Sequence, residues 1–218
     1  MKKILFACLA LFAVFSAAFG LDANKYITLD ENVQIKNAQN SVIEIFSYAC
    51  IHCYTHHKNG SLATIKQANP NASFALWQVE KMGQYGEQMM KIMAYGAAVD
   101  AKNNKDILDE NSVTQKLIGS YFEATFKYKM NFKNANEFYS LASKIFESFG
   151  QKASAEDIEN YALSESGKAY IQRANEGFEV AKITGTPAFI INGKYVLRNE
   201  KIESEADFLN SVKELLAM

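Results

Sequence analysis

The first half of the chain contains two apolar runs that are typical of buried β-strands. Near-continuous β-branched and aromatic residues over 41–49 predict a strand that is covered on both faces. Glu44 interrupts this run, and its apolar neighbours on both sides predict that it is buried. The sequence directly after it reads as a helix, and a second strand is predicted over 73–82, after a turn signal at Pro70.

From about residue 85 to 184 the hydrophobic pattern changes to the period of amphipathic helices. Ser154 stands three residues before Asp157, the spacing of a capping box at a helix start. Another helix is predicted to begin after Asn134, to carry Phe149 on its apolar face, and to stop at the next glycine. Gly185 is expected to end the last helix of this block.

Two short strands and a helix complete the chain. The strands "PAFIIN" and "KYVLR" meet at Asn192-Gly193, a hairpin signal, and Ser204 is placed to cap a final amphipathic helix. This order predicts an α/β fold in which both ends of the chain contribute to one sheet. We expect residues 21–84 and 185–218 to form that domain, and residues 85–184 to form a helical domain inserted in it.

The first 20 residues have the layout of a secretory signal peptide. Two lysines precede an apolar run over 4–15, and small residues follow it. We expect cleavage after Gly20 or Ala18 and export to the periplasm, with an uncleaved anchor as the alternative. Cys8 falls within this segment, so the mature chain keeps two cysteines in an oxidising compartment.

The side chains with chemical potential gather in one short stretch. The net charge is −1 and the charges are mixed, so the composition does not indicate nucleic acid or an anionic membrane as a partner. Two of the three cysteines and all three histidines lie between Cys50 and His57. Such a cluster could bind a metal, carry a haem or perform thiol chemistry.

The spacing within the cluster favours thiol chemistry. Covalent haem attachment needs a histidine directly after Cys53, where Tyr54 stands. A structural zinc site usually draws ligands from two places along the chain, and no second group exists, so a periplasmic metal-binding protein is the lesser alternative. A C-x-x-C at the first turn of a helix places Cys50 beside unpaired N–H groups and the positive end of the helix dipole. Both favour a thiolate, and an imidazolium at His52 would favour it further.

A distant segment supports this interpretation. "GTPAFIINGKY", which begins at Gly185, contains one of only two prolines of the chain, at the start of a strand. Together with "EIFSYACIHC" around Cys50, it resembles the DsbA-type periplasmic thiol:disulfide oxidoreductases of the thioredoxin superfamily. The resemblance covers nearly the whole mature chain, and implies a thioredoxin fold with an inserted helical domain.

The resemblance also implies the roles of individual residues in an enzyme that needs no cofactor. Cys50 and Cys53 would form the redox-active disulfide, with Cys50 as the nucleophile and Cys53 as the resolving thiol. His52 would stabilise the Cys50 thiolate. Glu44 would be the buried acid that accepts or relays the proton of Cys53.

Further implications concern substrates and partners. Thr186 and Pro187 would face the disulfide and bind an extended segment of a reduced, unfolded exported protein. A DsbB-type membrane oxidoreductase would reoxidise the cysteine pair. The resemblance implies a periplasmic protein, and we expect it to be a monomer.

Some positions depart from the pattern of that family. Ile51 stands where proline is usual, and Thr186 stands where DsbA has valine, although disulfide isomerases also carry threonine there. A disulfide isomerase or reductase is therefore the alternative function, although Ala49 stands where thioredoxin-type reductants have tryptophan. We expect His56 and His57, the latter at a position where an acid is usual, to be solvated residues of the helix.

Overall fold

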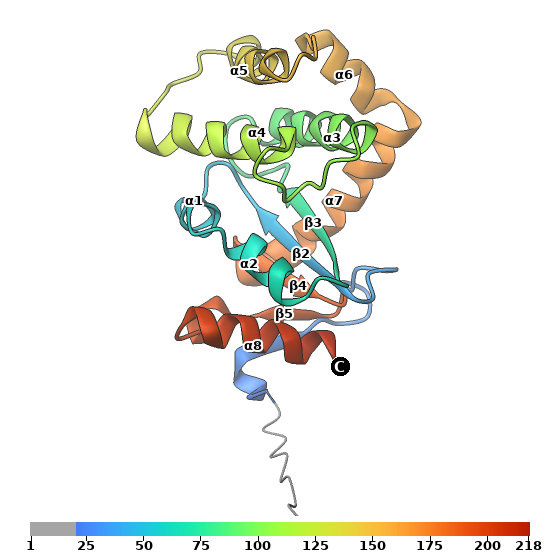
Figure 1. The fold of residues 1–218 in the computed structure, drawn as a ribbon, viewed down its shortest axis with the longest axis vertical. Coiled ribbons are helices and arrows are strands. Elements are labelled where there is room, and N and C mark those ends of the chain that lie inside the picture. The colour runs from blue at the N-terminus through green and yellow to red at the C-terminus, as the bar shows by residue number, and fades with distance from the viewer. Residues whose placement is uncertain (1–20) are drawn as a thin grey trace, which may run out of the picture.

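The computed structural model describes residues 21–218, and the predicted signal peptide lies outside them (Figure 1). A five-stranded mixed sheet in the order β1-β5-β4-β2-β3 forms the lower part of the molecule, and the helices between β3 and β4 form the upper part. Among the strands of residues 21–218, β2 and β3 are the one pair that runs in parallel. The strands are β1 (Tyr26–Thr28), β2 (Ser41–Phe46), β3 (Ser73–Gln78), β4 (Ala188–Ile191) and β5 (Tyr195–Leu197). The helices are α1 (Ile51–Lys58), α2 (Ser61–Ala68), α3 (Gly86–Lys102), α4 (Val113–Phe122), α5 (Ala135–Ser148), α6 (Ala155–Leu163), α7 (Glu165–Thr184) and α8 (Glu205–Leu216).

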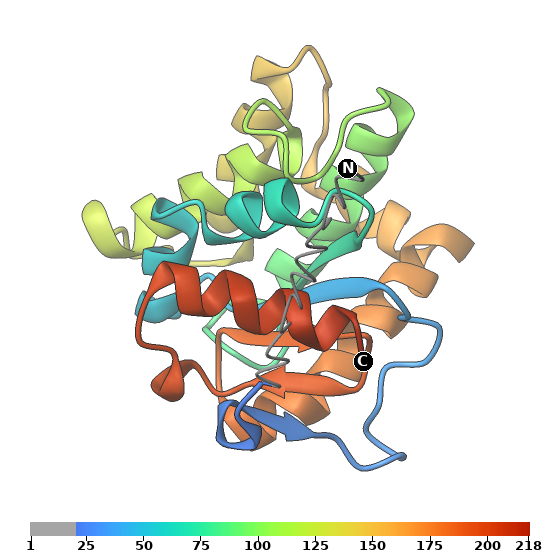
Figure 2. The same ribbon diagram turned by 60° about the horizontal axis from the view of Figure 1, so that its bottom comes forward.

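Helices cover both faces of the sheet. Alternate side chains of β2 point to opposite faces. Ile43 and Ile45 pack in the core under α7, whereas Val42 and Phe46 pack in a second, larger core that includes residues of α2 and α8. Figure 2 shows α8 lying across β4 and β5. Since Glu44 alternates with the isoleucines, it faces the larger core with Val42 and Phe46.

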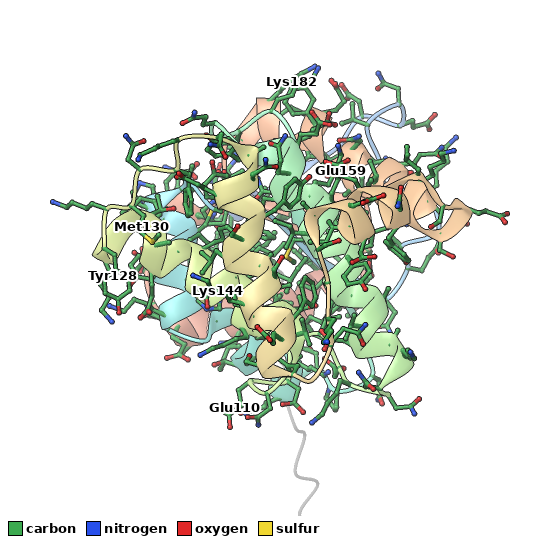
Figure 3. All side chains as sticks on the ribbon, turned by 90° about the horizontal axis from the view of Figure 1, so that it is seen from above. Glu110, Tyr128, Met130, Lys144, Glu159 and Lys182 are labelled. Atoms are coloured by element: carbon green, nitrogen blue, oxygen red, sulfur yellow. The ribbon has the colours of Figure 1, made fainter. Side chains whose placement is uncertain are left out.

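The helices between β3 and β4 extend the larger core upwards and complete the surroundings of α1. Helix α3 packs on β3, and α4 packs on α1. A π-helical turn (Glu123–Lys127) continues α4, and exposed Tyr128 and Met130 follow it at the outer edge of the helical part (Figure 3). This is a thioredoxin fold with an inserted helical domain, as predicted. Within residues 21–218, no helix is long and apolar enough to cross a membrane.

Local signals in the sequence correctly marked the helix ends. Ser154 and Asp157 form a complete capping box, and the Asn134 side chain accepts a hydrogen bond from the Glu137 N–H. Gly185 follows α7 with φ +75°, a backbone conformation that favours glycine. One helix-face prediction was wrong, because the Phe149 side chain lies beyond α5 and is 40% exposed.

The strand predictions were correct in position but too long. Strand β2 ends at Phe46 and β3 ends at Gln78, because the chain leaves the sheet after each of them. The buried side chain of Gln78 holds the segments that follow both strands. Its Oε1 accepts a hydrogen bond from the Tyr48 N–H at 2.9 Å, and its Nε2 donates to the Val79 carbonyl at 2.7 Å. Strand β1, which pairs with β5, was not predicted.

Candidate active site

The end of β2 places Cys50 at the N-terminus of α1. The Cys50 residue is the N-cap of that helix, with extended backbone angles, and its N–H donates to the Ser47 carbonyl at 3.0 Å. The Cys53 N–H donates to Cys50 Sγ at 3.3 Å, so the sulfur takes the place of a capping oxygen. Both cysteines are buried free thiols, Cys53 more deeply than Cys50.

The loop between α7 and β4 brings a second segment to the same sulfur. The Thr186–Pro187 peptide bond is cis, and the Thr186 carbonyl oxygen lies 3.2 Å from Cys50 Sγ, where it accepts a hydrogen bond when the thiol is protonated. Asn199 anchors this loop from the other side, because its Nδ2 donates to the Pro187 carbonyl at 2.7 Å. The structure therefore unites residues that lie 136 positions apart in the sequence.

The two thiols have opposite acidities. Hydrogen bonding by the Cys53 side chain, followed by the Thr186 side chain and the backbone N–H groups of Cys53 and His52, lowers the pKa of Cys50 to about 5 despite its burial. Burial, followed by the hydrogen bond and the negative charge of Cys50, raises the pKa of Cys53. Cys50 is consequently a thiolate at neutral pH, while Cys53 holds its proton.

Glu44 lies buried beneath this pair, as predicted. Its neighbours in the sheet are Leu76 on β3 and Phe189 on β4, so neither adjacent strand offers a cation or a hydrogen-bond donor at this level. Among the described residues, no side chain forms a hydrogen bond or an ion pair with its carboxyl group. Burial, and secondly the charge of Cys50, raise the pKa of Glu44 from 4.5 to about 8.

The three histidines occupy different environments. His52 is exposed on α1, and the structure places its backbone N–H among the groups that lower the pKa of Cys50. The prediction that His56 and His57 are solvated was wrong. His56 packs against Phe189, with ring centroids 5.3 Å apart, and its Nδ1 pairs with Ser61 Oγ at 3.2 Å.

His57 packs against Phe122 of α4, with ring centroids 5.4 Å apart. The prediction failed for both residues because α4 and α8 cover parts of α1 that a helix on the outside of a sheet would expose to solvent. Burial lowers the pKa of His56 and of His57. No cluster of three or more histidine, cysteine, aspartate or glutamate side chains able to hold a metal ion occurs in residues 21–218.

Sequence reasoning missed the residues that hold the site together. Gln78 braces the segment before Cys50, and Tyr48 Oη in the same segment accepts a hydrogen bond from the Tyr85 N–H at 2.9 Å. Asn199 braces the loop of Pro187. The buried run around Gln78 gave a signal, since an amide within apolar residues requires partners. No local signal marks Asn199, because its partner lies in another element.

No family model matches the chain. The chain is 25% identical over 213 residues to the thiol:disulfide interchange protein DsbL of Escherichia coli O6:H1, which covers 98% of this chain and 94% of the relative. It is 25% identical over 210 residues to the thiol:disulfide interchange protein DsbA of Yersinia pestis, and this alignment covers 94% of this chain and 91% of the relative.

Among solved structures, the crystal structure of DsbL from Salmonella enterica serovar Typhimurium superposes with a TM-score of 0.78 at 25% identity, covering 90% of this chain and 97% of that chain. The fold and the paired cysteines thus define a thiol:disulfide oxidoreductase of the thioredoxin superfamily. Within that class, the chain is similar over nearly its whole length to the thiol:disulfide interchange proteins DsbL and DsbA.

Proposed function

We propose that the protein is a periplasmic oxidase that donates its Cys50–Cys53 disulfide to reduced, unfolded exported proteins. The opposite pKa shifts of the two thiols support this proposal most directly. A stabilised thiolate at Cys50 favours the reduced form of the enzyme, and a stable reduced form makes the disulfide a strong oxidant. A reductase needs the reverse balance.

The proposed reaction conserves electrons and protons in two exchanges. A substrate thiolate attacks Cys50 Sγ of the disulfide, forms a mixed disulfide, and displaces Cys53 as a thiolate that takes up a proton. A second substrate thiolate then attacks the substrate sulfur of the mixed disulfide and displaces Cys50. The substrate leaves oxidised, and the enzyme holds the Cys50 thiolate and the Cys53 thiol. The low pKa of Cys50 makes it the better leaving group.

The remaining site residues assist this exchange. We propose that the Thr186–Pro187 loop pairs with an extended segment of the substrate beside Cys50, which is a form of strand addition. Glu44 supplies the proton that Cys53 takes up, and its burial beneath the pair supports this role. His52, exposed on α1 directly after Ile51, is proposed to stabilise the Cys50 thiolate.

We further propose the following cellular organisation. Residues 1–20 are a cleaved signal peptide, and the mature monomer works in the periplasm, where a DsbB-type membrane oxidoreductase restores its disulfide. Residues 21–84 and 185–218 form the thioredoxin-like domain, and residues 85–184 form the helical insertion domain. The near-complete coverage of relatives named DsbL and DsbA supports the comparison with periplasmic oxidases.

Redox equilibration with glutathione tests the direction of the reaction. A potential near about −120 mV, as for DsbA, supports an oxidase, and one near about −270 mV, as for thioredoxin, contradicts the proposal. The Cys50→Ser variant should lose activity toward a reduced substrate protein, and retention of the rate would exclude Cys50 as the nucleophile. The Cys53→Ser variant cannot form the Cys50–Cys53 disulfide, so it should also fail to oxidise a reduced substrate. Given a substrate that already contains a disulfide, it should accumulate a mixed disulfide at Cys50, because no Cys53 thiol remains to displace the substrate. Scrambled ribonuclease, refolded in parallel, separates an isomerase from an oxidase.

A further inference from the structure

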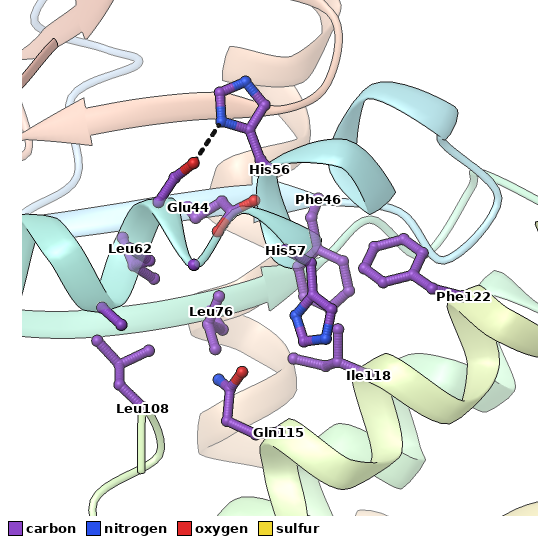
Figure 4. A pocket seen from close by; sticks show the side chains of 13 residues that line it. Glu44, Phe46, His56, His57, Leu62, Leu76, Leu108, Gln115, Ile118 and Phe122 are labelled. Atoms are coloured by element: carbon purple, nitrogen blue, oxygen red, sulfur yellow. Dashed lines mark hydrogen bonds between the residues drawn. The ribbon is translucent and has the colours of Figure 1, made fainter. Parts of the chain in front are cut away.

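A small cavity lies next to Glu44, on the side of the sheet that α1, α2 and α4 cover (Figure 4). It offers about 40 Å³ of space for water, which is enough for about one to three molecules. Its apolar wall includes Leu76 and Phe122. Its polar lining comes from Glu44, His56, His57, Ser61 and Gln115.

The cavity provides a route by which the carboxyl group of Glu44 can exchange protons with the solvent. In the proposed reaction Glu44 gives a proton to the Cys53 thiolate and must regain one before the next turnover. Leu76 and Phe189 beside it carry no proton. The cavity therefore offers a route for a proton between the solvent and Glu44, and the two histidines that line it are the side chains able to carry a proton along this route.

His57 connects the cavity to the surface. An open cleft between α1 and α4, lined also by charged Lys58, Lys116 and Glu123, adjoins the cavity. The residues that line both are His57, Gly60, Ala63, Leu108 and Gln115, and His57 is the titratable side chain among them. Its ring is held against Phe122, and a Cβ atom at Gly119 would lie only 3.0 Å from its Nε2. His57 therefore lies between the cavity beside Glu44 and the open cleft.

His56 also lines the cavity, but its Nδ1 is already paired with Ser61 Oγ at 3.2 Å. Its outward sides face a cleft beside α8 and the active-site groove. That groove is lined by His52, Thr186 and Pro187, the residues proposed to contact the substrate. A bound substrate would cover this route during the exchange. The cleft beside His57 contains none of those three residues, so a route through His57 stays open while the substrate is bound.

We propose that His57 is the proton port of the active site, which exchanges protons between the solvent and Glu44 through the water of this cavity. The proposal rests on the proposed function of Glu44. When the Cys53 thiolate takes the proton of Glu44, the neutral imidazole of His57 passes a proton inward from one ring nitrogen and regains one from the cleft on the other. His57 touches neither sulfur and acts only through Glu44.

The charges around His57 are compatible with this role. Burial lowers its pKa, which keeps the imidazole neutral at pH 7, with one donor and one acceptor nitrogen. The titratable and charged groups that face it are Glu44 on β2, His56 and Lys58 on α1, Glu110 before α4, Lys116 on α4 and Glu123 on the π-helical turn. Both signs of charge are present, so the groups of the cleft do not strongly raise or lower the proton affinity of the His57 imidazole.

Stopped-flow measurement of the proton balance with a pH indicator tests the port. The disulfide form of the mature protein is mixed with an excess of a reduced dithiol peptide. The peptide releases two protons and the enzyme takes up one at Cys53, so the net release of one proton is followed beside the thiol–disulfide exchange. We expect His57→Ala to slow the proton-linked step by about tenfold or more. Added imidazole should restore the rate, because it fits the vacated space and carries protons. His56→Ala, the matched control, should leave the rate near that of the wild type.

Two outcomes would overturn the proposal: an unchanged rate in His57→Ala, or a slow rate that imidazole does not restore. The variant His57→Gln keeps the size and polarity of the side chain without a transferable proton, and it should be equally slow. It serves as the test if His57→Ala does not fold. The glutathione potential of each variant should equal that of the wild type. A wild-type potential in the reductase range would reject the proposed oxidase while leaving the port testable in the reverse direction.

Discussion

Replacement of Glu44 by glutamine should change the pH dependence of stability in a defined direction. The folded protein raises the pKa of this carboxyl group from 4.5 to about 8. Between these values the unfolded chain releases the proton while the folded protein holds it, so the unfolded state gains relative stability as the pH rises. The pH-dependent loss in the free energy of unfolding that Glu44 causes is therefore absent below about pH 4.5 and grows until about pH 8.

The magnitude follows from the linkage relation. Each pH unit within this window lowers the free energy of unfolding by about 1.4 kcal/mol, which gives about 3 kcal/mol at pH 7 and about 5 kcal/mol at pH 8 and above. The amide of Glu44→Gln does not titrate, so the variant loses this slope. Any cost of burying the amide is the same at every pH, and the slope is therefore the informative quantity.

Urea unfolding of the reduced protein at pH 4.5, 6, 7 and 8 measures this difference. The free energy of unfolding of Glu44→Gln, relative to that of the wild type, should rise steadily with pH. The free energy of unfolding of the exposed control Glu147→Gln should change with pH as that of the wild type does. In a Cys50→Ser background the thiolate charge is absent, so the slope should end at a lower pH. A constant difference between Glu44→Gln and the wild type across this range would refute the reasoning.

Three further predictions concern the thiols and the fold. Thiolate absorbance of the reduced protein should titrate with a midpoint near pH 5. Cys53→Ala should raise that midpoint, because the hydrogen bond from the Cys53 side chain is the largest cause of the lowered pKa of Cys50, and an unaltered midpoint would contradict this. Gly177→Ala should cost about 1–3 kcal/mol in urea unfolding, because the new Cβ would lie 2.4 Å from Ile45 Cδ1, and wild-type stability would show that α7 shifts freely. Ser154→Ala should cost about 1 kcal/mol by loss of the capping box, whereas an equal cost in exposed Ser166→Ala would argue against a capping effect.

The sequence predicted those parts of the fold that local chemistry determines. Ser154 and Asp157 satisfy each other within one turn, and Gly185 adopts its positive φ through its own backbone. Strand β1 was missed because it has only three residues and exists through pairing with β5, near the other end of the chain. Its register, Tyr26 opposite Leu197, depends on tertiary contacts that no local pattern contains.

The same distinction separates the site residues that were predicted from those that were not. Cys50 and Pro187 belong to motifs, and Glu44 stands out as a charge within an apolar run. The environment of His57 depends instead on α4, which begins more than fifty residues later and packs over α1. A polar residue on a short helix gives no indication that a distant helix will cover it.

The charge of Cys50 links the acidities of the whole site. It raises the pKa of Glu44 and also that of Cys53, in addition to the larger effect of burial on each. With Cys50 as a thiolate, Cys53 therefore keeps the proton, and transfer from Glu44 to Cys53 is favourable at the end of substrate oxidation. Once Cys50 is bound in a mixed disulfide, that charge is gone and both pKa values fall. Proton release from Cys53 through Glu44 then becomes easier, which assists the attack of Cys53 on a mixed disulfide whenever the Cys50–Cys53 disulfide forms again. Covalent chemistry at one sulfur thus sets the direction of proton movement beneath the other.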